Sequence, residues 1–197
     1  MTPEIMAFGK SLIFPQEINY KRVIEIGSYN VNGSYANFVK SYRPREYVAV
    51  DIHYCDHYKG EWKPNDITAY HLPEPCVNMV MNVRDLVDKY GEESFDFVIS
   101  TEMLEHVEDW KGTISVIKKI LRPNGYLVLT TRSPGFPLHS WPDDWWRFTL
   151  RDMELIFSDC EIIALKPEVA CAGVFIKVKK PIHFFENALD MDVYSMK

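Results

Sequence analysis

The chain has 197 residues, of which 47% are hydrophobic and 25% are charged, and its formal net charge is −6. This length and apolar content suit one domain with a buried core and exclude an intrinsically disordered chain. The excess of acidic side chains argues against broad contact with phosphates, so a nucleic-acid partner is disfavoured.

The cysteines and the apolar segments indicate the cellular context. Four cysteines are present and none forms a C-x-x-C pair, so we expect free thiols in a reducing compartment. The longest apolar stretches are too short for a membrane span, and the first residues lack the basic and apolar regions of a secretory signal. These features predict a cytoplasmic protein without a membrane span.

Segments with helical periodicity alternate with short apolar runs along the chain. The pattern predicts helices at about 4–14, 32–41, 83–90, 110–121 and 149–157. It predicts strands at 22–26, 47–51, 77–81, 95–100, 126–131, 161–166 and 174–179. The run Arg122-Pro-Asn-Gly125 is typical of a turn between a helix and a strand. Residues 53–76 show no persistent periodicity, and we expect an ordered loop or a small excursion with surface histidines.

This alternation defines an α/β fold with a mostly parallel sheet and helices on both faces. The last two strands have only a short connection, which predicts an antiparallel C-terminal hairpin. We expect one domain over residues 1–180, in which 1–20 form an N-terminal helical cap. Residues 181–197 are expected to form a tail that docks on the body or on a partner subunit, which would give a homodimer.

The end of the first predicted strand has features of a cofactor site. Gly27 follows an apolar strand, and Asp51 ends the next strand 24 positions later. A tight turn and a carboxylate in these places suit a cofactor that contains a nucleoside. However, Tyr29 stands where a dinucleotide fingerprint has its second glycine, and its side chain would oppose a pyrophosphate. A cofactor without phosphate is therefore favoured.

Four segments, in order, resemble the class I S-adenosylmethionine-dependent methyltransferases over about residues 20–180. They are Glu25-Ile-Gly-Ser28, Val48-Ala-Val-Asp51, Phe95-Asp-Phe-Val-Ile-Ser-Thr-Glu-Met-Leu-Glu-His106 and Leu121-Arg-Pro-Asn-Gly-Tyr-Leu-Val-Leu-Thr130. The last two are most similar to the methyltransferase type 11-like branch, which includes small-molecule methyltransferases of the ubiquinone-biosynthesis type. The resemblance implies S-adenosyl-L-methionine as cofactor and a Rossmann-like, doubly wound, seven-stranded sheet.

The resemblance also implies roles for residues at the ends of the strands. Glu25 and Gly27 would shape the turn beneath the amino-acid part of the cofactor. Asp51 would bind both ribose hydroxyls, and Asn82 would accept from the adenine amino group. Ile52 and Val83 would enclose the adenine ring. The complete set of expected cofactor-binding residues is Glu25, Gly27, Ser28, Tyr29, Asp51, Ile52, Asn82, Val83, Thr101 and Glu102.

Candidate catalytic residues follow the fourth and fifth predicted strands. A base helps methyl transfer to an oxygen or nitrogen acceptor, and His139, His106 and Glu105 are the candidates. Some relatives bind a metal through a similar E-x-x-E-H pattern and one further ligand. Here Glu102, Glu105 and His106 match the pattern, and His139 would supply the further ligand. Because many relatives carry the same pattern without a metal, we expect none here.

The segment His139–Thr149 combines aromatic residues with charged ones, at the edge of the sheet where ligands bind in such folds. One interpretation gives Asp144, Trp145 and Arg147 the task of binding the acceptor. The other is a packed aromatic lid in which Asp144 and Arg147 form an internal ion pair.

The function that these features favour is methyl transfer to a small or medium-sized acceptor by direct in-line displacement. The glycine-poor turn after the first strand leaves one alternative, a non-catalytic methyltransferase-like module that binds a cofactor or a partner. A nicotinamide-dependent reductase is disfavoured because the G-x-G-x-x-G fingerprint is missing.

Overall fold

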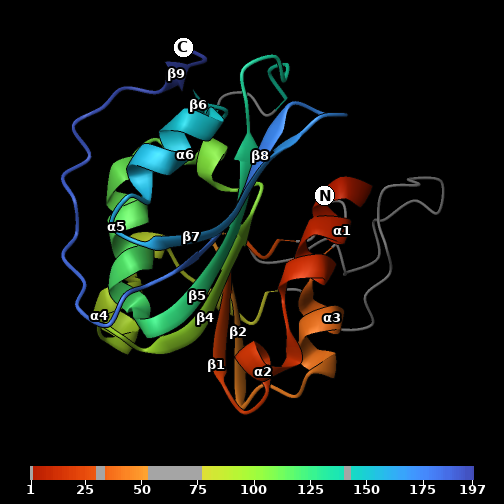
Figure 1. Cartoon of the computed structure of the whole chain (residues 1–197), viewed down its shortest axis with the longest axis vertical. Helices are drawn as coiled ribbons and strands as arrows, with labels where there is room; N and C mark the ends of the chain where they lie inside the picture. Colours follow the sequence, from red (N-terminus) through yellow and green to blue (C-terminus); the bar gives the residue numbers. More distant parts are fainter. Residues whose placement is uncertain (1, 30–33, 53–76, 140–142) are drawn as a thin grey trace.

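The elements of the chain form three layers, with one sheet between two sets of helices (Figure 1). The computed structural model describes residues 2–29, 34–52, 77–139 and 143–197. The strands of the sheet are β1 (Arg22–Ile26), β2 (Glu46–Asp51), β3 (Met79–Val80), β4 (Phe95–Thr101), β5 (Leu121–Arg132), β7 (Glu161–Glu168) and β8 (Gly173–Lys179).

The strand order is β3-β2-β1-β4-β5-β8-β7. Neighbours from β3 to β5 are parallel, whereas β8 is antiparallel to both β5 and β7. The predicted mostly parallel sheet with an antiparallel C-terminal hairpin is therefore confirmed. The order reverses direction at β1 and β4, and crevices that bind ligands occur at such a point, beyond the carboxyl ends of the strands.

Helices cover both faces of the sheet (Figure 1). One face carries α1 (Pro3–Leu12), α2 (Pro15–Ile18) and α3 (Ala36–Ser41); the other carries α4 (Leu86–Tyr90), α5 (Trp110–Ile120) and α6 (Leu150–Ile156). Two 3-10 turns, η2 (Val83–Asp85) and η3 (Leu104–His106), follow β3 and β4. In α5 the residues Ile114, Ile117 and Ile120 recur at helical spacing and are fully buried, which fixes the face that meets the sheet.

Several helix and strand boundaries in the first half of the chain differ from the prediction. The opening helix stops at Leu12, and Pro15 begins a separate helix because proline suits the first turn of a helix. The next helix begins at Ala36 rather than 32, and Ser34 Oγ accepts from the Ala36 amide at 2.9 Å. The third strand is only Met79–Val80, and the predicted helix 83–90 is divided into η2 and α4. The expected loop 53–76 lies outside the described residues.

The predicted turn at 122–125 is instead part of β5. Asn124 has a φ of 61°, and the pairing of β4 with β5 shifts register next to this segment. The Asn124 amide donates to Lys180 O at 2.8 Å, and the Lys180 amide donates to Gly125 O at 2.9 Å. Because these bonds to the chain after β8 continue the ladder, a local irregularity replaces the expected turn.

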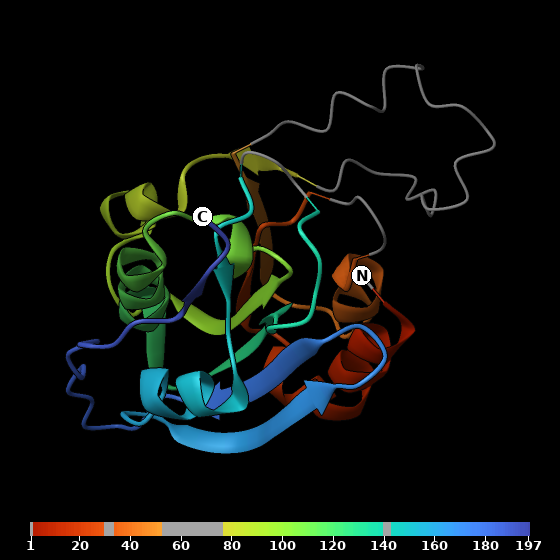
Figure 2. The same cartoon turned by 90° about the horizontal axis from the view of Figure 1, so that it is seen from above.

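The C-terminal segment lies along the side of the domain that carries α4, α5 and α6 (Figures 1 and 2). Its residues Leu189, Met191 and Val193 pack against the core. Its last strand, β9 (Tyr194–Ser195), pairs antiparallel with β6 (Trp146–Arg147). The homodimer through this segment stays a prediction.

None of the helices in the described ranges is long and apolar enough to cross a membrane. Cys160 and Cys171 are free thiols, and Cys55 and Cys76 lie outside the described residues.

Candidate functional site

A cleft with a volume of about 690 Å³ opens at the carboxyl ends of β1, β2 and β4. This volume is typical of sites for small molecules. The cleft is lined by Ile26, Gly27, Tyr29, Val50, Asp51, Ile52, Met81, Asn82, Val83, Arg84, Glu102, Met103, His106, Val107, Glu108, Asp109, Asp143 and Trp145. Residues from both halves of the parallel sheet therefore meet in one space.

The turn after β1 requires glycine at position 27. Gly27 has a φ of 74°, a region that favours glycine. A Cβ atom there would lie 2.5 Å from Cγ of Met103. The amides of Gly27 and Ser28 both donate to Val50 O, at 2.9 and 3.0 Å, and so fasten the turn to β2. The structure thus places a partly buried turn beside the end of β2.

Asp51 lies at the end of β2 and lines the cleft. Its Oδ2 accepts a hydrogen bond from the Tyr29 amide at 3.0 Å. A carboxylate has two oxygens, which together can accept about four hydrogen bonds. The position and the chemistry both suit a vicinal diol such as that of a ribose.

Glu25, Ser28 and Thr101 are buried and are not among the residues that line the cleft. Glu25 accepts hydrogen bonds from the hydroxyl of Tyr47 and, at 3.4 Å, from that of Ser34. Burial raises the pKa of Glu25 to about 7, although these hydrogen bonds favour the ionised form. Glu25 therefore connects β1 to Tyr47 of β2 and to Ser34 ahead of α3, below the surface of the cleft.

Three predicted residues for the adenosine part lie together at the β2 and β3 side of the cleft. Ile52 is 59% exposed, Val83 is buried, and Asn82 caps η2 by accepting from the Arg84 amide at 3.0 Å. An amide oxygen has two lone pairs, so the Asn82 side chain can cap the turn and accept one more hydrogen bond.

Glu102 lines the cleft with a strained backbone, since its φ is 56°. Its side chain accepts from Thr130 Oγ1 at 3.0 Å and is paired with Arg132, which also donates to Glu168 at 2.8 Å. Burial, followed by the nearby charge of Glu105, raises the pKa of Glu102 to about 8. These contacts fix the carboxyl group at the end of β4.

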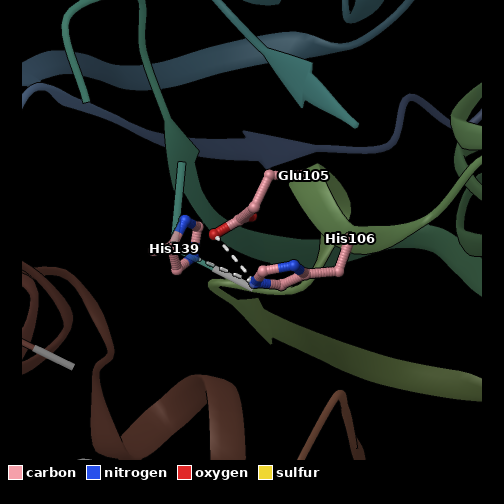
Figure 3. Close-up of side chains that lie close together, drawn as sticks. All are labelled: Glu105, His106 and His139. Atoms are coloured by element: carbon pink, nitrogen blue, oxygen red, sulfur yellow. Dashed lines mark hydrogen bonds and ion pairs between the residues drawn. The ribbon is translucent and has the colours of Figure 1, made fainter. Parts of the chain in front are cut away.

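Glu105, His106 and His139 come together although 33 positions separate the two histidines (Figure 3). His139 Nε2 lies 3.2 Å from His106 Nε2, which in turn lies 3.9 Å from Glu105 Oε1. Glu105 is fully buried, and its other oxygen accepts from Thr131 Oγ1 at 2.7 Å. Burial raises the pKa of Glu105. The three candidate catalytic residues therefore form one cluster, which His106 connects to the cleft.

Asp144 and Arg147 are fully buried and form a two-point ion pair, with distances of 2.5 and 2.7 Å. Asp144 Oδ2 also accepts from the backbone amide and from Nδ1 of His139, both at 2.9 Å. Burial opposes ionisation of Asp144, but the hydrogen bonds from Arg147 and His139 outweigh it and hold the pKa at about 2. Of the three predicted acceptor residues, only Trp145 lines the cleft, and its amide donates to Glu105 O at 2.8 Å.

The sequence did not identify every residue of the cleft. Met103 lines the cleft and packs against Gly27. Arg84 and Asp109 also line it and form an ion pair at 3.1 Å. The only indication in the sequence that Met103 lines the cleft was that it directly follows Glu102 in the fourth-strand motif. Arg84 and Asp109 are 25 positions apart, and no spacing rule connects them.

Comparison with known proteins agrees with this geometry. A family model described as a methyltransferase domain matches residues 4–158. No curated protein matches the sequence. The chain is similar to the N-methyltransferase NodS from Bradyrhizobium japonicum WM9 in complex with S-adenosyl-L-homocysteine, at 13% identity and a TM-score of 0.62, with 91% of this chain and 89% of that chain covered.

Two further solved structures are similar over most of their length. The first is the Burkholderia thailandensis 1,6-didemethyltoxoflavin-N1-methyltransferase with bound 1,6-didemethyltoxoflavin and S-adenosylhomocysteine, at 15% identity and a TM-score of 0.60, covering 91% of this chain and 77% of that chain. The second is an S-adenosylmethionine-dependent methyltransferase from Mesorhizobium loti, at 15% identity and a TM-score of 0.58, covering 90% of this chain and 96% of that chain.

Because the family model covers more than half of the sequence, the chain belongs to the methyltransferase-domain family, as an S-adenosylmethionine-dependent enzyme of class I. The resemblance to the class I S-adenosylmethionine-dependent methyltransferases is thereby confirmed, and S-adenosyl-L-methionine is the cofactor of this family.

Proposed function

We propose that the protein holds S-adenosyl-L-methionine in the cleft and transfers its methyl group to a small or medium-sized acceptor by direct in-line displacement. The observation that carries this proposal is that the Gly27 turn and Asp51 line the same cleft as His106 and Trp145. Groups suited to a nucleoside and groups suited to proton removal thus share one space of about 690 Å³. When bound, the cofactor supplies a methyl group already activated on a sulfonium.

The residues at the β1, β2 and β3 ends fit the cofactor. Asp51 would accept from the ribose hydroxyls, and Ile52 with Val83 would cover the adenine ring, whose amino group Asn82 would bind. Backbone groups of Gly27 to Tyr29 and the carboxyl group of Glu102 would hold the amino-acid part. Glu25, Ser28 and Thr101 would act from beneath the cleft surface by supporting these groups.

The cluster of Glu105, His106 and His139 is proposed to activate the acceptor. His106 faces the cleft, so its Nε2 can take the proton that an oxygen or nitrogen acceptor loses as it bonds to carbon. His139 lies beside it and Glu105 lies behind it. Trp145 would contact the acceptor, whereas Asp144 and Arg147, being buried, would position His139.

The type of acceptor can be tested with radiolabelled cofactor. The protein would be incubated with S-[methyl-¹⁴C]adenosylmethionine and with separate small-molecule, protein and RNA fractions of a cell extract. We expect label in the small-molecule fraction only, since the net charge of −6 disfavours nucleic acid. Enzyme-dependent label in the RNA or protein fraction alone would overturn the proposed acceptor class.

The role of the cluster has its own test. His139→Ala should lower turnover with the labelled fraction at least tenfold and leave the affinity for S-adenosylhomocysteine within about twofold. His183, which is exposed and outside the cleft, gives the matched control His183→Ala. Normal turnover in His139→Ala would leave this residue with a packing role only.

A further inference from the structure

A buried network of charged side chains extends from Glu102 away from the cleft. Arg132, the last residue of β5, pairs with the carboxyl group of Glu102 and donates to Glu168 Oε2 at 2.8 Å. The side chain of Glu168 is fully buried, and those of Arg132 and Glu102 are 7% and 17% exposed. Of these three residues, only Glu102 lines the cleft. The network therefore meets the cleft through a single carboxyl group.

Several contacts hold the far end of this network in place. The hydroxyl group of Thr2, which caps α1, donates to Glu168 Oε1. Cζ of Arg132 lies 4.1 Å from the centroid of the Phe136 ring. A Cβ atom at position 173 would lie 2.6 Å from Glu168 Oε2, so Gly173 leaves the room that this carboxyl group needs. The guanidinium and the buried carboxyl group therefore have little freedom to move.

The charges of the network do not balance. The carboxyl groups of Glu102 and Glu168 share one guanidinium, so one negative charge is in excess when both are ionised. Burial raises the pKa of Glu102, and the neighbouring carboxyl groups of Glu105 and Glu168 raise it further. A cation beside Glu102 would offset the excess and favour the ionised carboxylate. Because Glu102 lines the cleft, a ligand in the cleft can supply that cation.

Glu102 lies beside the turn that would hold the amino-acid part of the cofactor. Because β1 and β4 are adjacent and parallel, the turn after β1 and the residues after β4 lie at the same edge of the sheet. Met103, the next residue, packs against Gly27 of that turn. The φ of 56° at Glu102 is a strained value of the kind that is retained where a side chain must be held in one position. The α-ammonium is the cationic group of the amino-acid part, so it would approach this carboxyl group.

We propose that Arg132 and Glu168 are positioning residues, which hold the carboxyl group of Glu102 for the α-ammonium group of S-adenosyl-L-methionine. This inference rests on the proposed function, since it requires the cofactor in this cleft. A hydrogen bond between an ammonium and a carboxylate is strengthened by the charge on both partners. The planar fork of Arg132 fixes the direction of Glu102. Glu168 offsets part of the charge of Arg132, which leaves Glu102 able to attract a second cation.

Two ligands separate this contact from the rest of the cofactor site. They are S-adenosylhomocysteine and an analogue in which hydrogen replaces its ammonium group, and calorimetric titration of the full chain measures both dissociation constants. The wild-type chain should bind the analogue at least tenfold more weakly, because the charged hydrogen bond is lost. Equal affinities would overturn the proposal and leave the cofactor site intact. Failure of both ligands to bind would overturn the proposed function, and this proposal with it.

Variants test whether the network is responsible. Glu102→Gln should weaken binding of S-adenosylhomocysteine at least tenfold, and Arg132→Lys and Glu168→Gln at least fivefold. None should change the affinity for the ammonium-free analogue by more than about twofold, because that ligand offers the network no cation. Arg122→Lys is the matched control: Arg122 lies near the other end of β5 and pairs with Asp96 at 3.1 Å, so both affinities should stay unchanged.

The ligand comparison distinguishes positioning from a general effect on the fold. Thermal unfolding would verify that each variant is folded, and the nearly isosteric Glu102→Gln and Glu168→Gln keep the test available if Arg132→Lys does not fold. A purely structural role would weaken both ligands equally. Equal losses in folded variants, or an unchanged affinity for S-adenosylhomocysteine, would overturn the proposal.

Discussion

The amide of Tyr29 donates a hydrogen bond to Oδ2 of Asp51 at 3.0 Å, and this contact joins the turn after β1 to the end of β2. Asp51 thus has two tasks: it organises the turn and presents a carboxylate to the cleft. The two tasks can be separated by substitution.

Asp51→Ala should weaken binding of S-adenosylhomocysteine at least tenfold while the protein stays folded. Loss of a charged acceptor for the ribose hydroxyls costs about 1.5–3 kcal/mol. Asp51→Asn keeps one acceptor oxygen and should give a smaller loss. Calorimetric titration measures both, and an unchanged dissociation constant in folded Asp51→Ala would place the cofactor elsewhere.

Gly27→Ala should destabilise the protein by about 2 kcal/mol or more, because a positive φ and a contact with Met103 act together. Gly91→Ala is the matched control: Gly91 has a φ of 80°, but the nearest atom to an added Cβ is Ser94 Oγ at 3.8 Å. Urea unfolding of Gly27→Ala, Met103→Ala and the double variant would separate the two causes. The double variant should be more stable than additivity predicts, and strict additivity would exclude the clash.

The buried ion pair of Asp144 and Arg147 should contribute much more to the free energy of unfolding than an exposed ion pair does. Asp144→Asn leaves the Arg147 charge uncompensated and should lower the free energy of unfolding by about 3 kcal/mol or more. Glu154→Gln removes an exposed pair with Arg151 and should cost less than about 0.5 kcal/mol. Equal losses in chemical denaturation would contradict the role of Asp144 in fixing the segment that holds His139.

Glu25 should make the stability of the protein fall as the pH rises from about 4.5 to about 7. Its pKa is raised from 4.5 to about 7 by burial, so the folded state binds a proton more tightly than the unfolded state across that window. The loss at higher pH amounts to roughly 3 kcal/mol. Glu25→Gln should remove this part of the pH dependence, as measured by melting temperatures from pH 4 to pH 8. Parallel wild-type and variant curves would show that Glu25 does not titrate in this range.

Much of the fold followed from local patterns. Apolar strands, the capping box of Thr149 with Asp152, and the glycine turn are properties of a few neighbouring residues. These patterns predicted the helices, the strands and the mostly parallel arrangement of the strands. They also placed Gly27 and Asp51 at strand ends, which in a parallel sheet lie at one edge. The irregularity at Asn124 escaped prediction because its partner, Lys180, is distant in sequence.

The sequence by itself thus determined the class of fold, the family, and the turn and carboxylate at the ends of β1 and β2, since these depend on short motifs in a fixed order. Only the tertiary structure decided how the chemical groups combine. Glu105 and His139 meet because β4 and β5 are adjacent and parallel, which brings the segments that follow them to the same edge. Burial, likewise, is a property of the whole assembly, and it turned Asp144 and Arg147 from candidate acceptor contacts into an internal ion pair beside His139.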